Sequence, residues 1–192
     1  MTINPNNNIN NSLNDHKELI STIKSLGLTL KIAKGKCILT EGEDVNHIFI
    51  IEKGCFRTFR WINDEEVTIG FSFEGDIDTC PYAFINQLKS TDCIEALTDS
   101  QVIKIHRNEL LNLERQKPEL NKYIQRLLSH YIEILIQRNI DLRLKSADQL
   151  YQELHKRQPD KVYKIPLMYI ASYLGISKER LSRIRKNFKP ID

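Results

Sequence analysis

The feature that most constrains the fold is a long stretch, residues 119–150, which contains neither glycine nor proline and begins directly after Pro118. Apolar residues recur in it at intervals of three and four, which is the spacing of one face of an α-helix. Proline is favoured at the start of a helix and disfavoured in its interior, so Pro118 fits the helix N-terminus. The predicted helix is longer than one small domain requires.

One register of this helix has the alternating spacing of a coiled-coil seam with one polar position. The seam consists of Leu128, Ile132, Leu135, Asn139 and Leu142. It would suit a parallel homodimer, and residues 118–145 are therefore predicted to be a dimerisation helix. The same stripe could instead pack against the rest of the chain, but the length of the helix favours the dimer.

The sequence between Leu28 and Leu113 consists of short β-rich runs separated by turn residues. The runs are CILT, HIFIIEKG, CFRTFRWI, VTIGFSF and SQVIKIH, and the turns lie at Gly42, Gly54, Asn63-Asp64 and Gly75. Many closely spaced short strands predict a compact β-roll or barrel. Residues 16–117 are expected to form this domain, opened by a short helix at 16–26 that Gly27 would end, and the whole chain is expected to be α+β.

Residues 1–15 are rich in asparagine and poor in large apolar side chains, so we expect a flexible tail. The N-terminus lacks the features of a signal peptide, and no segment is long and apolar enough to span a bilayer. A cytoplasmic protein without a membrane partner is expected. The cysteines form no C-x-x-C pair and the histidines no short-spaced pair, so neither a metal site nor a cofactor is predicted, and most cysteines are expected to be buried.

Charge is divided unevenly along the chain. Residues 143–192 hold twelve Lys and Arg against five Asp and Glu, a net +7, which leaves −4 on residues 1–142 because the chain totals +3. The C-terminal part is the better candidate to meet a polyanion.

Residues 167–187 have the spacing of two packed helices joined by a tight turn. Ala171 is small where the helices would approach, Gly175 can adopt the left-handed conformation after the first helix, and Ser177 can cap the second. With Leu181 and Ile184 facing inward, the outer face is cationic and rich in hydrogen-bonding groups. This pattern predicts a helix-turn-helix DNA-binding domain over residues 146–192, with its reading helix at 177–187. The alternative is an ordinary surface helix with solvated charges.

Two further features concern this domain. The segment VYKI, residues 162–165, is predicted to be extended and to help hold phosphates. Only residues 188–192 follow the reading helix, too few for a β-hairpin wing, so the wing is expected to be truncated.

The order of β-roll, long helix and C-terminal helix pair resembles the Crp/Fnr family of transcription regulators, which includes the catabolite activator protein, over nearly the whole chain after residue 16. Residues 176–183, ISKERLSR, are similar to the start of the family's recognition helix. The resemblance implies base contacts from Lys178, Glu179 and Arg183, and the flanks of that face are expected to hold phosphates. The phosphate-contacting candidates are Arg180, Ser182, Arg185 and Lys186. Expected partners are double-stranded DNA with a palindromic site, a second copy of the chain and, as a candidate, RNA polymerase.

A second resemblance lies in the β-rich region, where Gly42-Glu43, Lys53-Gly54 and the run FEGD, residues 73–76, look like the family's turn glycines and cyclic-nucleotide pocket. It implies a double-stranded β-helix like that of cyclic-nucleotide-binding domains. The candidate effector pocket comprises Gly75, Asp76, Lys89, Ser90 and Thr91.

This pocket departs from the family pattern. Asp76 stands where nucleotide-binding members have Glu, and Ser90 stands near the expected Arg. No arginine occurs between Gly75 and Ala96, where the net charge is −3, so a buried phosphate would be repelled. Cyclic AMP is not expected to bind, and the small-molecule effector is unknown. The first cysteine, Cys37, lies inside the β-rich region, so the N-terminal ligands of the family's iron–sulfur members are missing.

The sequence therefore predicts a sequence-specific DNA-binding transcription regulator that acts as a homodimer and carries a β-roll sensor domain. The alternative is a ligand-binding regulatory module, cyclic-nucleotide-like or redox-responsive through Cys80 and Cys93, without direct DNA readout. An enzyme is not expected, because the chain has no phosphate-cradling glycine loop, G-x-S-x-G or H-E-x-x-H.

Overall fold

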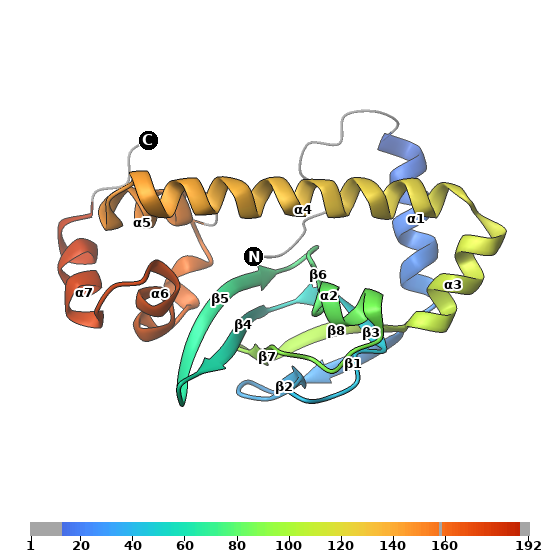
Figure 1. Cartoon of the computed structure of the whole chain (residues 1–192), viewed down its shortest axis with the longest axis horizontal. Helices are drawn as coiled ribbons and strands as arrows, with labels where there is room; N and C mark the ends of the chain where they lie inside the picture. Colours follow the sequence, from blue (N-terminus) through green and yellow to red (C-terminus); the bar gives the residue numbers. More distant parts are fainter. Residues whose placement is uncertain (1–12, 158, 189–192) are drawn as a thin grey trace.

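A computed structural model describes residues 13–157 and 159–188 of the chain. One long helix runs along a β-roll, with two shorter helices at one end and three at the other (Figure 1). Among the described residues no helix is long and apolar enough to cross a membrane.

Eight strands form the β-roll. They are β1 (Leu28–Ile32), β2 (Cys37–Leu39), β3 (His47–Lys53), β4 (Cys55–Ile62), β5 (Glu65–Phe73), β6 (Ile77–Asp78), β7 (Cys93–Ala96) and β8 (Ser100–His106). They pair antiparallel in two four-stranded sheets, ordered β1-β8-β3-β6 and β2-β7-β4-β5. All five β-rich runs expected from the sequence contribute a strand, so the α+β class and the β-roll are confirmed.

The turns between strands follow the expected residues. Asn63 and Asp64 have φ of 51° and 62°, the left-handed pair that a tight β4–β5 hairpin needs. Gly54 has φ of 107°, and a Cβ there would lie 2.1 Å from the Ser100 hydroxyl, so only glycine fits between β3 and β4.

The interior of the roll is filled by alternate side chains of both sheets. Phe49 and Ile51 of β3 meet Phe56 of β4, Ile94 of β7 and Val102 of β8, and each is at most 4% exposed. Successive strand residues point to opposite faces, which brings these positions into one core.

Seven α-helices and one 3₁₀ turn complete the described chain. They are α1 (Leu13–Ser25), α2 (Pro81–Asn86), α3 (Arg107–Gln116), α4 (Glu119–Leu144), α5 (Ala147–Arg157), the 3₁₀ turn η1 (Val162–Lys164), α6 (Leu167–Leu174) and α7 (Lys178–Asn187). The long predicted helix is present but stops at Leu144, and Ser146 restarts the chain as α5 by accepting a hydrogen bond from the Gln149 amide.

Three local expectations need correction. The β region ends at His106 rather than at Leu113, because residues 107–113 belong to α3. The Asn108 amide at the start of α3 donates a hydrogen bond to the His106 ring. The segment 162–165 is a 3₁₀ turn rather than an extended strand, because Val162 and Ile165 both turn into the core beside α5. Helix α1 starts at Leu13, so residues 13–15 of the expected tail are helical, and residues 1–12 lie outside the described residues. Helix α1 ends at Ser25, just before Gly27 as expected, and Gly27 also allows close packing, since a Cβ there would lie 2.3 Å from Ile103 Cγ2.

The two halves of α4 have different environments. Its first half packs on α1, α3 and β8 through Leu120, Tyr123 and Leu127, which are buried. Its second half exposes apolar side chains: Ile132 (56%), Leu135 (40%), Ile136 (50%), Ile140 (42%) and Leu142 (46%). The β-roll therefore covers only part of the helix.

Candidate DNA-binding surface and effector pocket

The C-terminal helix pair has the turn that its sequence predicts. Gly175 follows α6 in the left-handed conformation, with φ of 67° and ψ of 34°, and its amide and that of Ile176 donate to carbonyls of the last turn of α6. The Ser177 hydroxyl then accepts a hydrogen bond from the Arg180 amide at 3.2 Å and caps α7. Each helix end is thus satisfied locally, which fixes the angle between the helices.

Apolar residues hold the pair together. Ile170 and Leu174 of α6 pack with Leu181 and Ile184 of α7 in one buried cluster, where Ala171 is 3% exposed. These are the inward positions expected from the sequence.

The opposite face of α7 carries the predicted DNA-contacting residues. Lys178, Glu179 and Arg183 are all exposed, so the three base-reading candidates share an accessible face. The phosphate candidates Arg180, Ser182 and Lys186 are exposed as well, whereas Arg185 is half-buried with its guanidinium carbon 5.6 Å from the Tyr163 ring centroid. Among the described residues no salt bridge engages Lys178, Arg180 or Arg183.

The single acid on this face is held at the helix start. Its own backbone amide and the Ser177 hydroxyl lower the pKa of Glu179, so the carboxylate is ionised and turned toward the N-terminus of α7. To accept a hydrogen bond from the amino group of a base, the carboxylate would have to leave these donors.

Arg57 is a functional candidate that sequence reasoning missed. This β4 side chain is 1% exposed, and its Nη2 contacts Glu66 at 2.6 Å and Glu95 at 2.7 Å. Its guanidinium carbon lies 3.6 Å from the ring centroid of Tyr169 on α6, so it joins the β-roll to the helix pair. One sequence signal could have pointed to its burial. Arg57 lies between Cys55 and Phe59 at alternate positions of β4, so the three side chains share one face of the strand.

Two more contacts attach the helix pair to the remainder of the chain. The Ser172 hydroxyl accepts from the Thr68 amide at 2.9 Å and donates to the Glu66 carbonyl. From the other side, Arg138 of α4 donates to the Tyr173 carbonyl and stacks 3.6 Å over its ring. Helix α6 is thus contacted by β5 on one side and by α4 on another.

The predicted effector pocket is held together by its own hydrogen bonds. Gly75 has φ of 89° and its amide donates to the Ile51 carbonyl, while the buried Asp76 carboxylate accepts from the Phe73 amide at 2.9 Å. Ser90, 3% exposed, donates its hydroxyl to the Asp92 carbonyl at 2.7 Å. Asp76 and Ser90 therefore each stabilise a turn through a side-chain hydrogen bond.

The charges nearby are also engaged. Lys89 Nζ donates to the Gly42 carbonyl at 2.9 Å. Arg60 of β4, which lies far from this segment in the sequence, donates to the Thr91 hydroxyl and the Asp92 carboxylate, each at 2.8 Å. The structure thus brings one arginine to Thr91, but Asp92 neutralises it.

Comparison with known proteins agrees with this geometry. Residues 29–117 match the cyclic nucleotide-binding domain family. FixK2 from Bradyrhizobium japonicum is 17% identical with a TM-score of 0.72, covering 83% of this chain and 83% of that one. A protein from Eubacterium rectale described as a transcriptional regulator of the Crp/Fnr family is 18% identical with a TM-score of 0.67, covering 88% and 81%. The catabolite activator protein of Thermus thermophilus is 19% identical with a TM-score of 0.57, covering 88% and 81%.

The chain has the fold of these solved structures, and its residues 29–117 match the cyclic nucleotide-binding domain family. A search of curated proteins finds no match.

The four cysteines are free thiols. Cys55, Cys80 and Cys93 are buried, as expected for most of them, and Cys37 is exposed. Burial raises the pKa of the Cys93 thiol, which opposes the thiolate form that redox chemistry needs. Within the described residues no cluster of His, Cys, Asp and Glu could hold a metal ion.

Proposed function

We propose that the chain is a homodimeric transcription regulator that reads DNA through α7. The observation that carries this proposal is the exposed cationic face of α7, which no salt bridge among the described residues neutralises and which is presented by a rigid two-helix turn. Cationic side chains on a helix that projects from the body of a protein match the charge and width of the DNA major groove. The Eubacterium rectale protein described as a transcriptional regulator of the Crp/Fnr family has this fold, which supports the proposal.

Arg183, Lys178 and Glu179 are proposed to select the sequence. Arg183 can present a bidentate fork to guanine, Lys178 can donate to guanine, and Glu179 can accept from cytosine. Arg180, Ser182, Arg185 and Lys186 flank that face and are proposed to hold phosphates, which position the helix without choosing bases.

The second half of α4 supports the homodimer. Ile132, Leu135 and Leu142 of the predicted seam are exposed, and so is Asn139, while Leu128 is half-buried against the β-roll. An uncovered apolar stripe of this kind favours association with a second copy. Two copies related by a two-fold axis would read a palindromic site with half-site centres about 34 Å apart.

The proposed test is selection of DNA from sheared genomic fragments, followed by affinity measurements on the recovered site at two salt concentrations. Arg183→Ala should cost about 1–3 kcal/mol on the best site and relax preference at one base pair. Lys186→Ala is the matched control on the same helix: it should weaken all sequences alike and reduce the salt slope by about one. If Arg183→Ala leaves affinity and preferred sequence intact, α7 is not the reading helix.

The β-roll is proposed to act as a sensor whose effector is not cyclic AMP. Lys89 donates to the Gly42 carbonyl, and Arg60 forms an ion pair with Asp92. Neither of these two described cations is therefore free to pair with a phosphate. Calorimetry should detect no saturable binding of cyclic AMP at micromolar concentration. The domain limits 16–117, 118–145 and 146–192, the cytoplasmic location and a contact with RNA polymerase remain predictions.

A further inference from the structure

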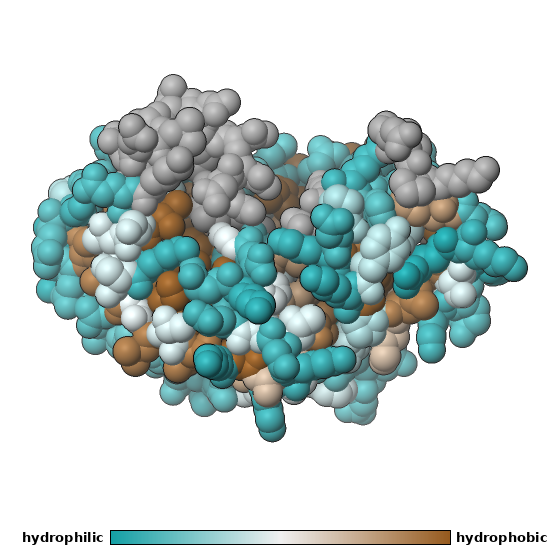
Figure 2. Space-filling model, turned by 180° about the vertical axis from the view of Figure 1, so that it is seen from behind, coloured by the Kyte–Doolittle hydropathy of each residue, from teal (hydrophilic) through white to brown (hydrophobic). Residues whose placement is uncertain are grey.

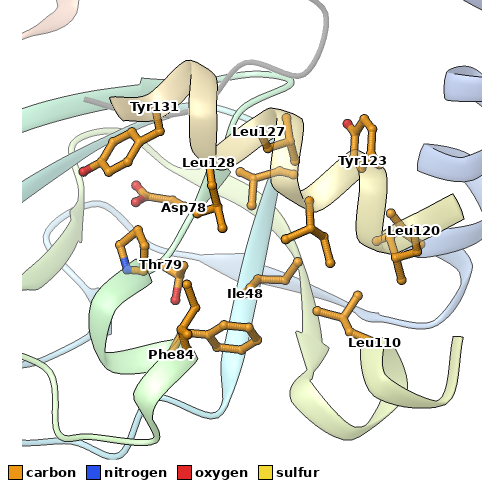
Figure 3. Close-up of a pocket in the computed structure, with 15 residues that line it drawn as sticks. Ile48, Asp78, Thr79, Phe84, Leu110, Leu120, Tyr123, Leu127, Leu128 and Tyr131 are labelled. Atoms are coloured by element: carbon orange, nitrogen blue, oxygen red, sulfur yellow. The ribbon is translucent and has the colours of Figure 1, made fainter. Parts of the chain in front are cut away.

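A second hollow, separate from the predicted effector pocket, lies between the β-roll and the first half of α4 (Figure 3). Its volume is about 140 Å³ and its wall is almost wholly apolar. The main wall residues are Ile48 of β3, Phe84 of α2, Leu110 of α3, and Leu120, Leu127 and Leu128 of α4. We call this space the α4 pocket. In Figure 2 hydrophobic side chains reach the surface on the side that carries α1 and α3.

The α4 pocket and the candidate effector pocket share no residue. Gly75, Asp76, Lys89, Ser90 and Thr91 are all absent from its lining. The two sites also differ in chemistry, because the candidate effector pocket is made of hydrogen-bonded turns and the α4 pocket is a space between packed helices and strands.

One end of the α4 pocket is polar. Asp78, Thr79 and Tyr131 gather there, whereas Leu110, Leu120 and Tyr123 lie toward the other end (Figure 3). Asp78 is 4% exposed and accepts a hydrogen bond from the Ser72 hydroxyl. The Thr79 hydroxyl is already used, since it donates to the His47 carbonyl at 3.0 Å. The lining residues that the structure describes include no lysine or arginine, so an acceptor carboxyl at the end of an apolar space is the main polar feature of the described lining.

We propose that the α4 pocket binds a small, uncharged, mainly apolar molecule that carries one hydroxyl group, with the hydroxyl donating to Asp78. The volume sets the size, because an apolar cavity of about 150 Å³ accommodates a molecule such as benzene. The carboxyl sets the chemistry: an anion would be repelled by Asp78, and the described lining residues include no lysine or arginine to compensate, whereas a hydroxyl supplies the donor that a buried acceptor favours. Apolar walls with few polar groups are typical of small-molecule sites.

The position of the α4 pocket gives it a regulatory consequence, which rests on the proposed function. Its walls belong both to the β-roll and to α4, the helix proposed to hold the dimer. A ligand that fits one arrangement of the β-roll and α4 better than another therefore shifts the population toward that arrangement. Occupancy would then change DNA affinity.

The test uses the full-length chain without DNA and three probes of similar size: benzyl alcohol, toluene and benzoate. Methyl NMR spectra follow titration with each probe. Benzyl alcohol should saturate, with shift changes in the isoleucine and leucine methyls that line the α4 pocket. Toluene should bind at least about three-fold more weakly because it leaves Asp78 without a new donor, and benzoate should not bind.

Two variants assign the site. Leu110→Trp fills the space and should weaken benzyl alcohol at least about ten-fold, while Leu111→Trp, at the exposed neighbouring position, should leave it unchanged. Asp78→Leu keeps the apolar walls and should remove the preference for benzyl alcohol over toluene, which tests the pocket even if the tryptophan variant does not fold.

The proposal is overturned if benzyl alcohol does not saturate, if Leu110→Trp and Leu111→Trp bind it equally, or if the preference survives Asp78→Leu. Because binding is read without DNA, such a failure leaves the DNA-binding proposal untouched. Unchanged DNA affinity and sequence preference in Arg183→Ala, which would contradict the DNA-reading proposal, would likewise leave the α4 pocket untouched.

Discussion

At the scale of single residues, Asp78 shows how burial changes an ordinary carboxyl. Burial raises its pKa to about 6, against the effect of the Ser72 hydroxyl, which stabilises the charged form. In the unfolded chain the pKa of the same group is about 4. Between these values the folded chain binds the proton more tightly, so this group makes the free energy of unfolding fall as pH rises from about 4 to about 6.

Asp78→Asn should remove this pH-dependent component because an amide does not titrate. The difference in free energy of unfolding, variant minus wild type, should rise by about 2–3 kcal/mol between about pH 4 and pH 6 and stay level above that window. Urea unfolding followed by circular dichroism at several pH values measures it. A difference that does not vary with pH would show that Asp78 titrates normally in the folded chain.

At the scale of elements, α4 is one helix with two roles. The buried residues of its first half fix it to α1, α3 and β8, and its second half places an apolar stripe in solvent. The stripe follows a seam spacing, and an asparagine in such a seam restricts the register and the number of strands. Dimerisation stays a prediction that the chain alone does not test.

Leu135→Asp should convert the dimer to a monomer, because it places a charge in an apolar interface. Leu135 is 40% exposed and Leu111 on α3 is 44% exposed, so Leu111→Asp is a matched control outside the seam. Light scattering at micromolar concentration should give a dimer mass for the wild type and for Leu111→Asp. A monomer mass for the wild type, or a dimer mass for Leu135→Asp, would contradict the seam.

At the scale of the whole molecule, the β-roll and the C-terminal helices share a core. Cys55, Phe71 and Phe73 of the roll belong to the same buried cluster as Tyr151 of α5 and Ile170 of α6. The Arg57 side chain lies at the edge of this contact, between two carboxylates and the Tyr169 ring. A change in the roll near β4 and β5 therefore reaches the helix pair through direct contacts.

Arg57→Met should destabilise the chain by about 2–4 kcal/mol, because it leaves Glu66 and Glu95 facing each other without their cation. Arg60→Met is the control on the same strand: the Arg60 side chain is 45% exposed, and loss of its pair with Asp92 should cost less than about 1 kcal/mol. Chemical unfolding measures both. Equal losses of stability would mean that the ion pairs of the buried Arg57 stabilise the chain no more than the ion pair of the half-exposed Arg60.

The sequence by itself determined the elements that depend on local signals. Short β-rich runs bounded by turn residues predicted β3, β4, β5 and β8, and helical spacing without glycine or proline predicted α4, because these signals lie in neighbouring residues. Gly175 and Ser177 marked the C-terminal turn for the same reason: a left-handed residue and a helix cap act within a few positions.

The contacts between residues far apart in the chain became known only from the folded structure. Nothing near Arg57 in the sequence shows that Tyr169 covers it, and Asp78 looks like any acidic residue until α4 buries it. The α4 pocket likewise arises because six elements meet without filling the space between them. Burial, a shifted pKa and a cavity depend on contacts between residues far apart in the chain, and a local pattern contains no information about those contacts.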